Sequence, residues 1–311
     1  MRRSSRFLSA LATAVALVAA GAAVTSLSSG HRVGVPAATA AAVSWAPQST
    51  ATIHPGVETF TNGAQCTANF VFTDGANVYL GQAAHCAGTG NDTQTNGCTS
   101  PVLPVGTPVT ISGASKPGVL VYDSWDTMQA QHETNPDVCQ YNDLALVQIN
   151  PADVGRVNPT IPVWGGPDGL ATSGAPSGSM VYSYGNSILR LGVTALSPKV
   201  GISEGSAGGG WSHTVFTVTP GIPGDSGSAF LDAHGDALGV LSTLGVSVPG
   251  GVVNNAGDLG LELAYLHTHT SFTSLQLVPG TAPFNPNAVP LNVSQPVDPN
   301  AVSNLQTFLG L

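Results

Sequence analysis

The stretch GIPGDSGS, residues 221–228, places three glycines and a proline around two serines. Glycine reaches backbone angles that other residues rarely adopt, and it lets a second chain approach the main chain closely. Gly224, two residues before Ser226, therefore suits a turn whose backbone N–H groups lie beside a hydroxyl. Taken alone, the segment also describes an ordinary surface turn, so its meaning depends on what accompanies it.

Two further segments carry residues whose chemistry complements a serine. AAHC at residues 83–86 contains His85, and YNDLALV at residues 141–147 contains Asp143. A serine hydroxyl is a weak nucleophile unless a neutral imidazole removes its proton, and a buried carboxylate holds that imidazole in the required tautomer. Each residue also has an ordinary explanation: a structural histidine, a strand-start cap and a turn serine. No packing requirement explains why all three occur together.

The three segments resemble the signatures of the chymotrypsin-like serine protease family of the bacterial secreted type. They occur in that family's order, with 58 residues from His85 to Asp143 and 83 residues from Asp143 to Ser226. The resemblance covers residues 60–270. It implies an all-β fold of two six-stranded antiparallel β-barrels with a C-terminal helix, and a catalytic site between the barrels. An α/β-hydrolase is disfavoured, because that fold orders its catalytic residues Ser, Asp, His and uses GxSxG, whereas Ser228 occupies the last position here.

The resemblance assigns a role to each matched residue. His85 is expected to act as general base and then as acid, Asp143 as the orienting carboxylate, and Ser226 as the nucleophile. The N–H groups of Gly224 and Ser226 are expected to form the oxyanion hole. This chemistry requires no metal and no organic cofactor, and its partner is a polypeptide substrate.

Six further positions match the family's substrate-binding segments. Pro220 stands six residues before Ser226, where an aspartate would select basic side chains, so cleavage after Lys or Arg is not expected. Leu241 stands where a histidine would indicate acidic specificity, and an apolar pocket is therefore expected. Ser242 is also expected to support Asp143. The expected substrate-binding residues are Pro220, Gly221, Ile222, Ser242, Thr243 and Leu244.

Asp225, in the same motif, needs a partner if it is buried, because an unpaired buried carboxylate is costly. In the family's animal members a newly created N-terminus supplies the positive charge, but no Ile-Val-Gly-Gly start is present here. Arg156 and Arg190 are the candidate partners among the few cations of the chain.

The N-terminus is typical of a secretory signal peptide. MRRSSR is a positive start, residues 7–24 are an apolar run, and Ala38-Thr39-Ala40 fits an A-x-A cleavage site. The alternative is an uncleaved membrane anchor, since the run reaches the lower limit of a spanning length. A secreted, extracellular protein is expected. The expected organisation is a signal peptide at 1–40, an N-terminal arm at 41–60, a protease domain at 61–278 and a Pro-rich C-terminal tail at 279–311.

Composition excludes several classes of protein. Hydrophobic residues make up 42% and charged residues 8% of the 311 residues, which excludes disorder, and 38 glycines with 23 prolines indicate many turns. A mature chain starting at residue 41 has four basic and 17 acidic residues, hence a net charge of −13. Such a surface repels phosphate backbones and anionic lipids, so neither nucleic acid nor a membrane is an expected partner after signal cleavage. A monomer is expected.

The four cysteines that follow the signal segment allow three pairings. Residues 67–73 and 78–83 are apolar runs on either side of an Asp-Gly pair, which is a hairpin signal. Cys66 and Cys86 bracket this hairpin and can pair across its open end, which closes a loop of about 20 residues worth roughly 3 kcal/mol. Cys98 and Cys139 then pair by elimination. The resemblance also implies a disulfide beside the catalytic histidine, and the spacing does not predict a zinc site.

Other elements follow from short apolar runs between Gly, Pro, Asn and Asp. One helix is expected over residues 259–267, capped by Asp258. The Gly-rich segment 203–213 is either a flap over a site or a flexible surface loop, and His213 within it is expected to face solvent. The remaining expected strands are 108–112, 118–122, 144–149, 180–184, 214–218, 228–231 and 237–243.

The sequence therefore predicts a secreted serine endopeptidase that hydrolyses peptide bonds through His85, Asp143, Ser226 and an acyl-enzyme intermediate. The alternative from another class is a non-catalytic binding or adhesion protein on the same fold, since a fold does not determine function. The presence of all three catalytic residue types counts against this alternative. A probe that reacts with activated serines distinguishes the two.

Overall fold

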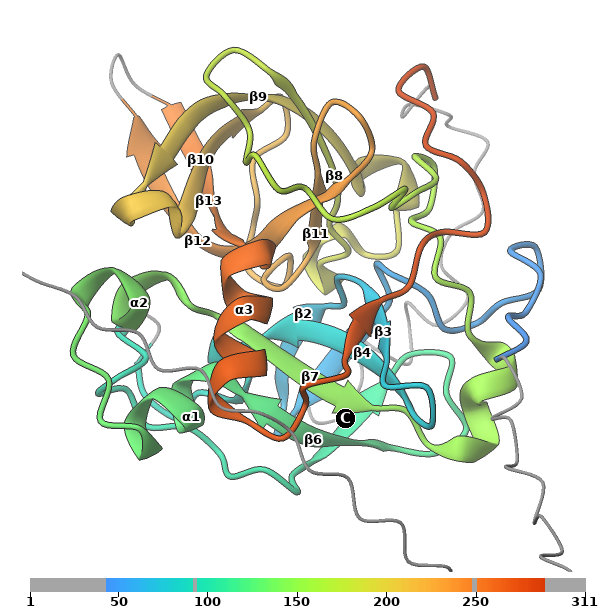
Figure 1. The fold of residues 1–311 in the computed structure, drawn as a ribbon. Helices are drawn as coiled ribbons and strands as arrows, with labels where there is room; N and C mark the ends of the chain where they lie inside the picture. Colours follow the sequence, from blue (N-terminus) through green and yellow to red (C-terminus); the bar gives the residue numbers. More distant parts are fainter. Residues whose placement is uncertain (1–42, 92–93, 248–250, 289–311) are drawn as a thin grey trace, which may run out of the picture. The chain divides into compact units, whose positions relative to one another are not determined.

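The computed structural model describes residues 43–91, 94–247 and 251–288 (Figure 1). The first half of this chain forms an eight-stranded antiparallel sheet in the order β14-β3-β4-β7-β6-β5-β1-β2, here called the first lobe. Its strands are β1 (Glu58–Thr61), β2 (Ala64–Thr67), β3 (Val71–Thr73), β4 (Val78–Ala83), β5 (Pro108–Ile111), β6 (Gly118–Asp123), β7 (Leu144–Gln148) and β14 (Gln276–Leu277).

The second half forms a closed six-stranded barrel in the order β10-β13-β12-β11-β8-β9, here called the second lobe. The all-β fold of two antiparallel lobes with a C-terminal helix is confirmed. The first lobe has eight strands rather than the six expected, partly because β14, from the segment after the helix, pairs with β3. The barrel strands are β8 (Met180–Tyr184), β9 (Pro198–Ala207), β10 (Ser212–Thr217), β11 (Ala229–Leu231), β12 (Ala237–Ser247) and β13 (Gly251–Asp258).

The hairpin of β3 and β4 closes as its turn residues predict. Asp74 accepts hydrogen bonds from the backbone N–H of Ala76 at 2.8 Å and of Asn77 at 2.7 Å, and from the Tyr79 hydroxyl at 2.6 Å. Burial, together with the neighbouring Asp74 carboxylate, raises the pKa of Tyr79 to about 12. The Cys66–Cys86 disulfide joins the open end of this hairpin, and Cys98 pairs with Cys139, so both expected pairings are confirmed.

The expected C-terminal helix is α3 (Leu259–His269), and the Asp258 side chain accepts from the Leu261 N–H at 2.8 Å. Two further short helices, α1 (Ser124–Ala130) and α2 (Pro136–Tyr141), were not predicted, because six or seven residues are too few to show a helical period. The 3₁₀ turns are η1 (Ala84–Ala87), η2 (Pro151–Arg156), η3 (Ile188–Arg190), η4 (Thr194–Leu196) and η5 (Gly208–Gly210).

The Gly-rich segment 203–213 is not a flexible loop. It comprises the end of β9, the turn η5 and the start of β10, and these two strands pair along their length with a bulge at Thr214 and Val215. His213 is 1% exposed and lies 2.8 Å from the Asp258 carboxylate, so the expectation that it faces solvent is wrong. Its burial follows from the alternation of side chains along β10, which a loop assignment does not capture.

The segments at the two edges of the expected protease domain pack against it. Ile53, in the expected N-terminal arm, is fully buried and forms a bridge with Val157, and the arm boundary at residue 60 falls within β1. Residues 270–288, here called the C-terminal strap, run from α3 through β14 to the second lobe, where Phe284 contacts Tyr182 edge-to-face at 5.0 Å. The expected signal peptide and residues 289–311 of the tail lie outside the described residues.

Removing the Phe284 ring tests whether the strap stabilises the fold. Phe284→Ala is expected to lower the free energy of unfolding by about 1–3 kcal/mol, because the half-buried ring loses its contact with Tyr182. Phe216→Ala is the matched control, since Phe216 is 45% exposed. Guanidinium denaturation measures both, and equal losses for the two variants contradict a stabilising strap.

Candidate active site

His85 and Asp143 are brought together by the pairing of β4 with β7. Ala83 at the end of β4 pairs with Leu144 at the start of β7, and the Ala84 N–H donates to the Asp143 carbonyl at 2.8 Å. Asp143 directly precedes Leu144, and His85 follows Ala84. The His85 Nδ1 lies 2.7 Å from the Asp143 Oδ2, and the His85 backbone N–H donates to Oδ1 at 2.9 Å. The carboxylate therefore holds both the ring and the main chain of His85.

Ser242 adds a third hydrogen bond to the same carboxylate. Its hydroxyl donates to the Asp143 Oδ2 at 2.6 Å, as the sequence predicted for this pair. The pairing of β12 with β13 shifts between Leu241 and Thr243, so Ser242 is the extra residue of a bulge. Bulges re-aim side chains, and this one accompanies the turn of Ser242 toward the first lobe. The Asp143 carboxylate thereby connects the two lobes.

Glu262 of α3 supports Asp143 from the other side, and no sequence signal indicated it. Its Oε1 accepts from the Asp143 backbone N–H at 2.9 Å, and the residue is fully buried. Burial raises the pKa of the Glu262 carboxyl well above its usual range, and the carboxylates of Asp143 and Asp258 raise it further. The raised pKa favours the neutral form of this carboxyl, the form that adds no second buried charge beside Asp143.

Ser226 lies on a turn that the two flanking glycines permit. Gly224 and Gly227 have φ angles of +92° and +85°, in the left-handed region. A Cβ on Gly227 would lie 2.8 Å from the Ala83 nitrogen and 2.7 Å from the Thr67 carbonyl oxygen, so no side chain fits. This close approach places the Ser226 turn against the end of β4, directly before His85.

Residues of β2 hold the carbonyl groups of this turn. The Thr67 hydroxyl and the Gln65 side-chain amide donate to the Gly224 carbonyl at 2.8 and 3.0 Å, and the Thr67 N–H donates to the Ser226 carbonyl at 2.8 Å. Within the described residues, the N–H groups of Gly224 and Ser226 donate to no protein acceptor. Two N–H donors on a fixed turn are thus available to a ligand.

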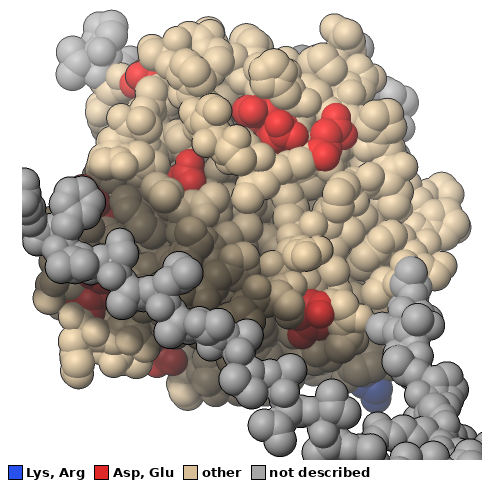
Figure 2. Space-filling view, viewed as in Figure 1, with Lys and Arg blue, Asp and Glu red and all other residues tan. Residues whose placement is uncertain are grey.

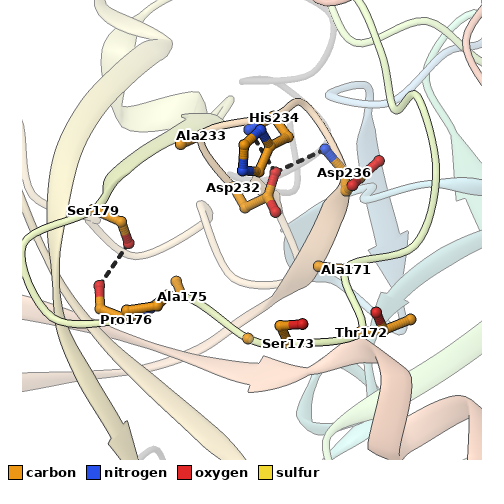
Figure 3. Close-up of a pocket in the computed structure, with 11 residues that line it drawn as sticks. Ala171, Thr172, Ser173, Ala175, Pro176, Ser179, Asp232, Ala233, His234 and Asp236 are labelled. Atoms are coloured by element: carbon orange, nitrogen blue, oxygen red, sulfur yellow. Dashed lines mark hydrogen bonds between the residues drawn. The ribbon is translucent and has the colours of Figure 1, made fainter.

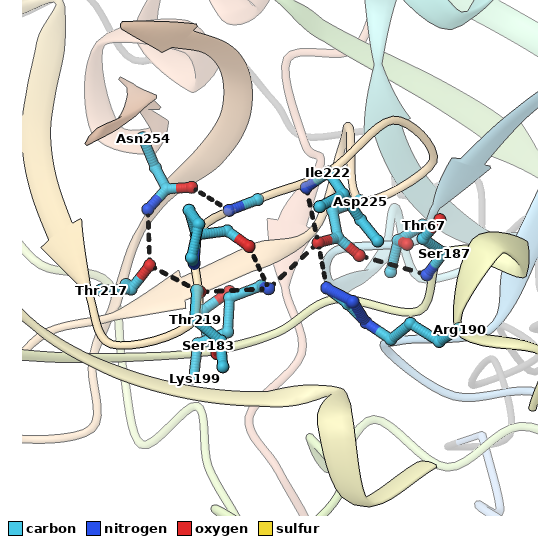
Figure 4. Close-up of polar contacts among 12 residues, drawn as sticks. Thr67, Ser183, Ser187, Arg190, Lys199, Thr217, Thr219, Ile222, Asp225 and Asn254 are labelled. Atoms are coloured by element: carbon cyan, nitrogen blue, oxygen red, sulfur yellow. Dashed lines mark hydrogen bonds and ion pairs between the residues drawn. The ribbon is translucent and has the colours of Figure 1, made fainter. Parts of the chain in front are cut away.

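Asp225 is fully buried and is paired with two cations (Figure 4). Arg190 of η3 contacts its Oδ2, so this candidate partner is confirmed. The other candidate, Arg156, pairs with Asp153 at 3.3 Å instead. Lys199 of β9 is the second partner, with its Nζ 3.0 Å from the same oxygen. Sequence analysis missed Lys199, because β9 was not among the expected strands and nothing else marked this lysine as buried.

The two expected substrate-binding segments lie next to each other. The Gly221 N–H donates to the Asn254 side chain at 2.8 Å, and a Cβ on Gly221 would lie 2.9 Å from Leu244 and 3.2 Å from Leu241. Ser242, Thr243 and Leu244 belong to β12, and Leu244 is 45% exposed. Pro220, Gly221 and Ile222 therefore run alongside the strand that the resemblance assigns to substrate pairing.

A pocket of the second lobe lies apart from these residues (Figure 3). None of its eleven lining residues belongs to the His85, Asp143 and Ser226 group, and Asp232, His234 and Asp236 supply its charged or titratable side chains. The Asp232 carboxylate accepts from the N–H groups of His234 and Asp236 at 2.8 and 2.9 Å. The Asp232 carboxylate is thus engaged in shaping a turn.

Metal-ligating side chains meet at one place within the described residues. Cys66, His85 and Cys86 lie within reach of a common ion, but the two sulfurs form a disulfide and offer no thiolate. On the face shown in Figure 2, acidic side chains are scattered and basic side chains show only at one edge. None of the helices described within residues 43–288 has the length and apolar character needed to cross a bilayer.

Comparisons with known proteins give likenesses among solved structures only. No family model matches the sequence, and no curated protein matches it. Among solved structures, Thermobifida fusca protease A is 19% identical with a TM-score of 0.46, over 73% of this chain and 99% of that one. Cellulomonas bogoriensis chymotrypsin is 18% identical with a TM-score of 0.41, over 73% and 98% of the two chains. Likenesses at these values carry no conclusion about the activity of this chain.

The raised pKa of Glu262 is expected to make the free energy of unfolding depend on pH. Because the folded-state pKa is raised above that of the unfolded chain, stability associated with this group is lost as pH rises above the usual glutamate pKa. Glu262→Gln removes this loss. With rising pH, the free energy of unfolding of the variant is therefore expected to increase relative to that of the wild type, by at most about 1.4 kcal/mol per pH unit.

Urea denaturation from pH 4.5 to 8 measures the difference between the two proteins. Exposed Glu204→Gln is the control. If the difference in free energy of unfolding between Glu262→Gln and the wild type stays constant over this range, the raised pKa of Glu262 is contradicted.

Proposed function

We propose that this protein is a secreted serine endopeptidase that cleaves polypeptides through an acyl-enzyme intermediate. The observation that carries the proposal is the buried Asp143 carboxylate, which accepts hydrogen bonds from the His85 ring, the His85 N–H and the Ser242 hydroxyl. A carboxylate bound in this way fixes the imidazole tautomer and stabilises the imidazolium that forms during proton transfer. The Ser226 turn lies against the strand end that carries this histidine.

The reaction proceeds in two halves. The Ser226 Oγ forms a bond to the substrate carbonyl carbon while His85 Nε2 takes the hydroxyl proton. The imidazolium gives this proton to the leaving amine as the peptide C–N bond breaks. A water molecule then attacks the acyl-enzyme, with His85 again acting as base and acid, and releases the carboxylic acid product.

The oxyanion of each tetrahedral intermediate is proposed to bind the N–H groups of Gly224 and Ser226. Both groups lack a protein acceptor within the described residues, and the carbonyl groups beside them are held by Thr67 and Gln65. A donor pair that is already oriented costs no reorganisation when the charge develops. The two ion pairs on Asp225 keep the intervening residue fixed.

The substrate is proposed to pair with β12 along Ser242, Thr243 and Leu244. Backbone groups of an exposed strand bind an extended peptide irrespective of its sequence, and side-chain pockets then select residues. The opposite wall of the primary pocket is proposed to consist of Pro220, Gly221 and Ile222. The pocket is expected to be apolar, because Leu241 and Leu244 lie against Gly221. The two disulfides fit an oxidising, extracellular compartment.

A fluorophosphonate probe tests the proposed function directly. We expect the mature, disulfide-intact protein to take one phosphonyl group, located on Ser226 by peptide mass spectrometry. Ser226→Ala is expected to take none. Folded wild-type protein that takes no label contradicts the proposal and favours the non-catalytic binding or adhesion protein.

The Ser242 hydroxyl offers a second test. Ser242→Ala removes one hydrogen bond to a charged acceptor, which is worth about 1.5–3 kcal/mol, so kcat/KM is expected to fall roughly 10-fold or more, mainly through kcat. The matched control is Ser247→Ala. Ser247 lies at the far end of β12, and its exposed hydroxyl donates to the Glu204 carboxylate. Equal kcat/KM for Ser242→Ala and the wild type removes Ser242 from the catalytic arrangement.

A further inference from the structure

Lys199 is the second of two lysines in the chain and is placed unlike the first. Lys116 is exposed, whereas the Lys199 side chain on β9 is fully buried inside the second lobe. Lysine is almost never buried unless it is paired, because removing its ammonium group from water is costly. Its position therefore requires an explanation beyond packing.

The Lys199 ammonium joins two segments of the proposed site (Figure 4). Its Nζ lies 3.0 Å from the Asp225 Oδ2, 3.2 Å from the Pro220 carbonyl oxygen and 3.5 Å from the Thr219 carbonyl oxygen. Three acceptors match the three donors of an ammonium group, so no donor is left for a substrate atom. Lys199 thus binds the Ser226 turn and the pocket wall at once, without touching substrate.

The wall that Lys199 binds is fixed at a second point. The Gly221 N–H donates to Asn254, whose own side-chain amide donates to the Thr217 hydroxyl at 2.8 Å. The segment 219–221 is therefore held between a buried amide and a buried ammonium. The Thr219 and Pro220 carbonyl groups accept hydrogen bonds from Lys199, so the ammonium group lies directly against this wall.

The charges at this point do not cancel when Lys199 is protonated. Asp225 is one anion, whereas Arg190 and Lys199 are two cations, and these are the charged groups that face one another here. Burial lowers the pKa of Lys199, the Asp225 carboxylate raises it, and the Arg190 guanidinium lowers it again, with a net decrease from 10.5. The excess positive charge is therefore present at lower pH and is lost on the alkaline side before an exposed lysine would titrate.

We propose that Lys199 is a specificity-determining positioning residue, which anchors the Thr219–Pro220 wall and places an excess positive charge behind it, so that the primary pocket rejects cationic side chains. This inference rests on the proposed peptidase function and names the substrate class that the site excludes. It accounts for a second buried cation at Asp225, where Arg190 alone already neutralises the carboxylate.

Two peptide substrates that differ only before the scissile bond test this inference. One carries arginine and the other citrulline, its neutral isostere, so their kcat/KM ratio isolates the effect of charge. At pH 7 the wild type is expected to prefer citrulline roughly 10-fold or more, which corresponds to about one pKa unit of unfavourable free energy between the like charges. Lys199→Met is expected to lower this ratio at least about fivefold, whereas Lys116→Met leaves it unchanged.

A small fluorophosphonate that lacks a side chain for the pocket separates specificity from a general structural effect. Its rate of reaction with Ser226 reports how far Lys199→Met disturbs the Ser226 turn, and a disturbance of that kind lowers both peptide rates alike and cancels in the citrulline-to-arginine ratio. Equal falls in labelling and in both peptide rates overturn the inference, as does an unchanged citrulline-to-arginine ratio. Wild-type protein that takes no label contradicts the proposed function and removes the inference with it.

A pH series on the wild type needs no variant and keeps the inference falsifiable if Lys199→Met does not fold. Arginine keeps its charge throughout the accessible range, so a change in the citrulline-to-arginine ratio reports on the protein. Because the pKa of Lys199 is lowered from 10.5, the ratio is expected to fall as pH rises and Lys199 loses its charge. A ratio of one at every pH, or a preference for arginine, overturns the inference.

Discussion

The hydrogen bonds to one buried carboxylate, that of Asp143, are the interaction on which the candidate site depends. Asp143 is 2% exposed and follows α2 at the start of β7, and it binds His85 from the first lobe and Ser242 from the second. The Ser242 contact needs both lobes to be in place, whereas the His85 contact forms within the first lobe. The cost of burying the charge is offset by three hydrogen bonds, and the neutral Glu262 carboxyl completes the arrangement without adding charge.

A second buried carboxylate, that of Asp225, fixes the turn that carries Ser226, as the Asp143 carboxylate fixes His85. It is held by Arg190, Lys199 and the N–H groups of Ser187 and Ile222, at 3.1 Å for both N–H groups. The described residues contain only four lysines and arginines, and two of them are used here. This concentration of cations in the interior leaves a strongly acidic surface and a positively charged backing to the pocket wall.

The motifs made much of this arrangement predictable. The resemblance implied that His85 and Asp143 meet, and the pairing of β4 with β7 brings them together. The bracketing of the hairpin by Cys66 and Cys86 predicted their disulfide. The pair of Ser242 with Asp143 followed from the resemblance. These features depend on local pattern and chain order, which the sequence displays.

The missed features depend on contacts between distant segments. Nothing around Glu262 marks it as the partner of a backbone N–H 119 residues earlier in the chain. Strand β13 escaped notice because Asn254, buried inside the barrel, interrupts its apolar pattern. His213 was misjudged for a similar reason, since burial of a polar residue in a Gly-rich segment is decided by the partner strand and not by the segment's own composition.

The most direct test of the account is to trap the acyl-enzyme. A chromogenic ester with slow deacylation, mixed with the mature protein at mildly acidic pH, is predicted to give a burst of one product per protein and an acyl group on Ser226, found by intact and peptide mass spectrometry. His85→Ala is predicted to abolish the burst while the protein remains folded. Product release without a burst, or an acyl group on any other residue, would contradict the assignment of Ser226, His85 and Asp143 as one catalytic unit.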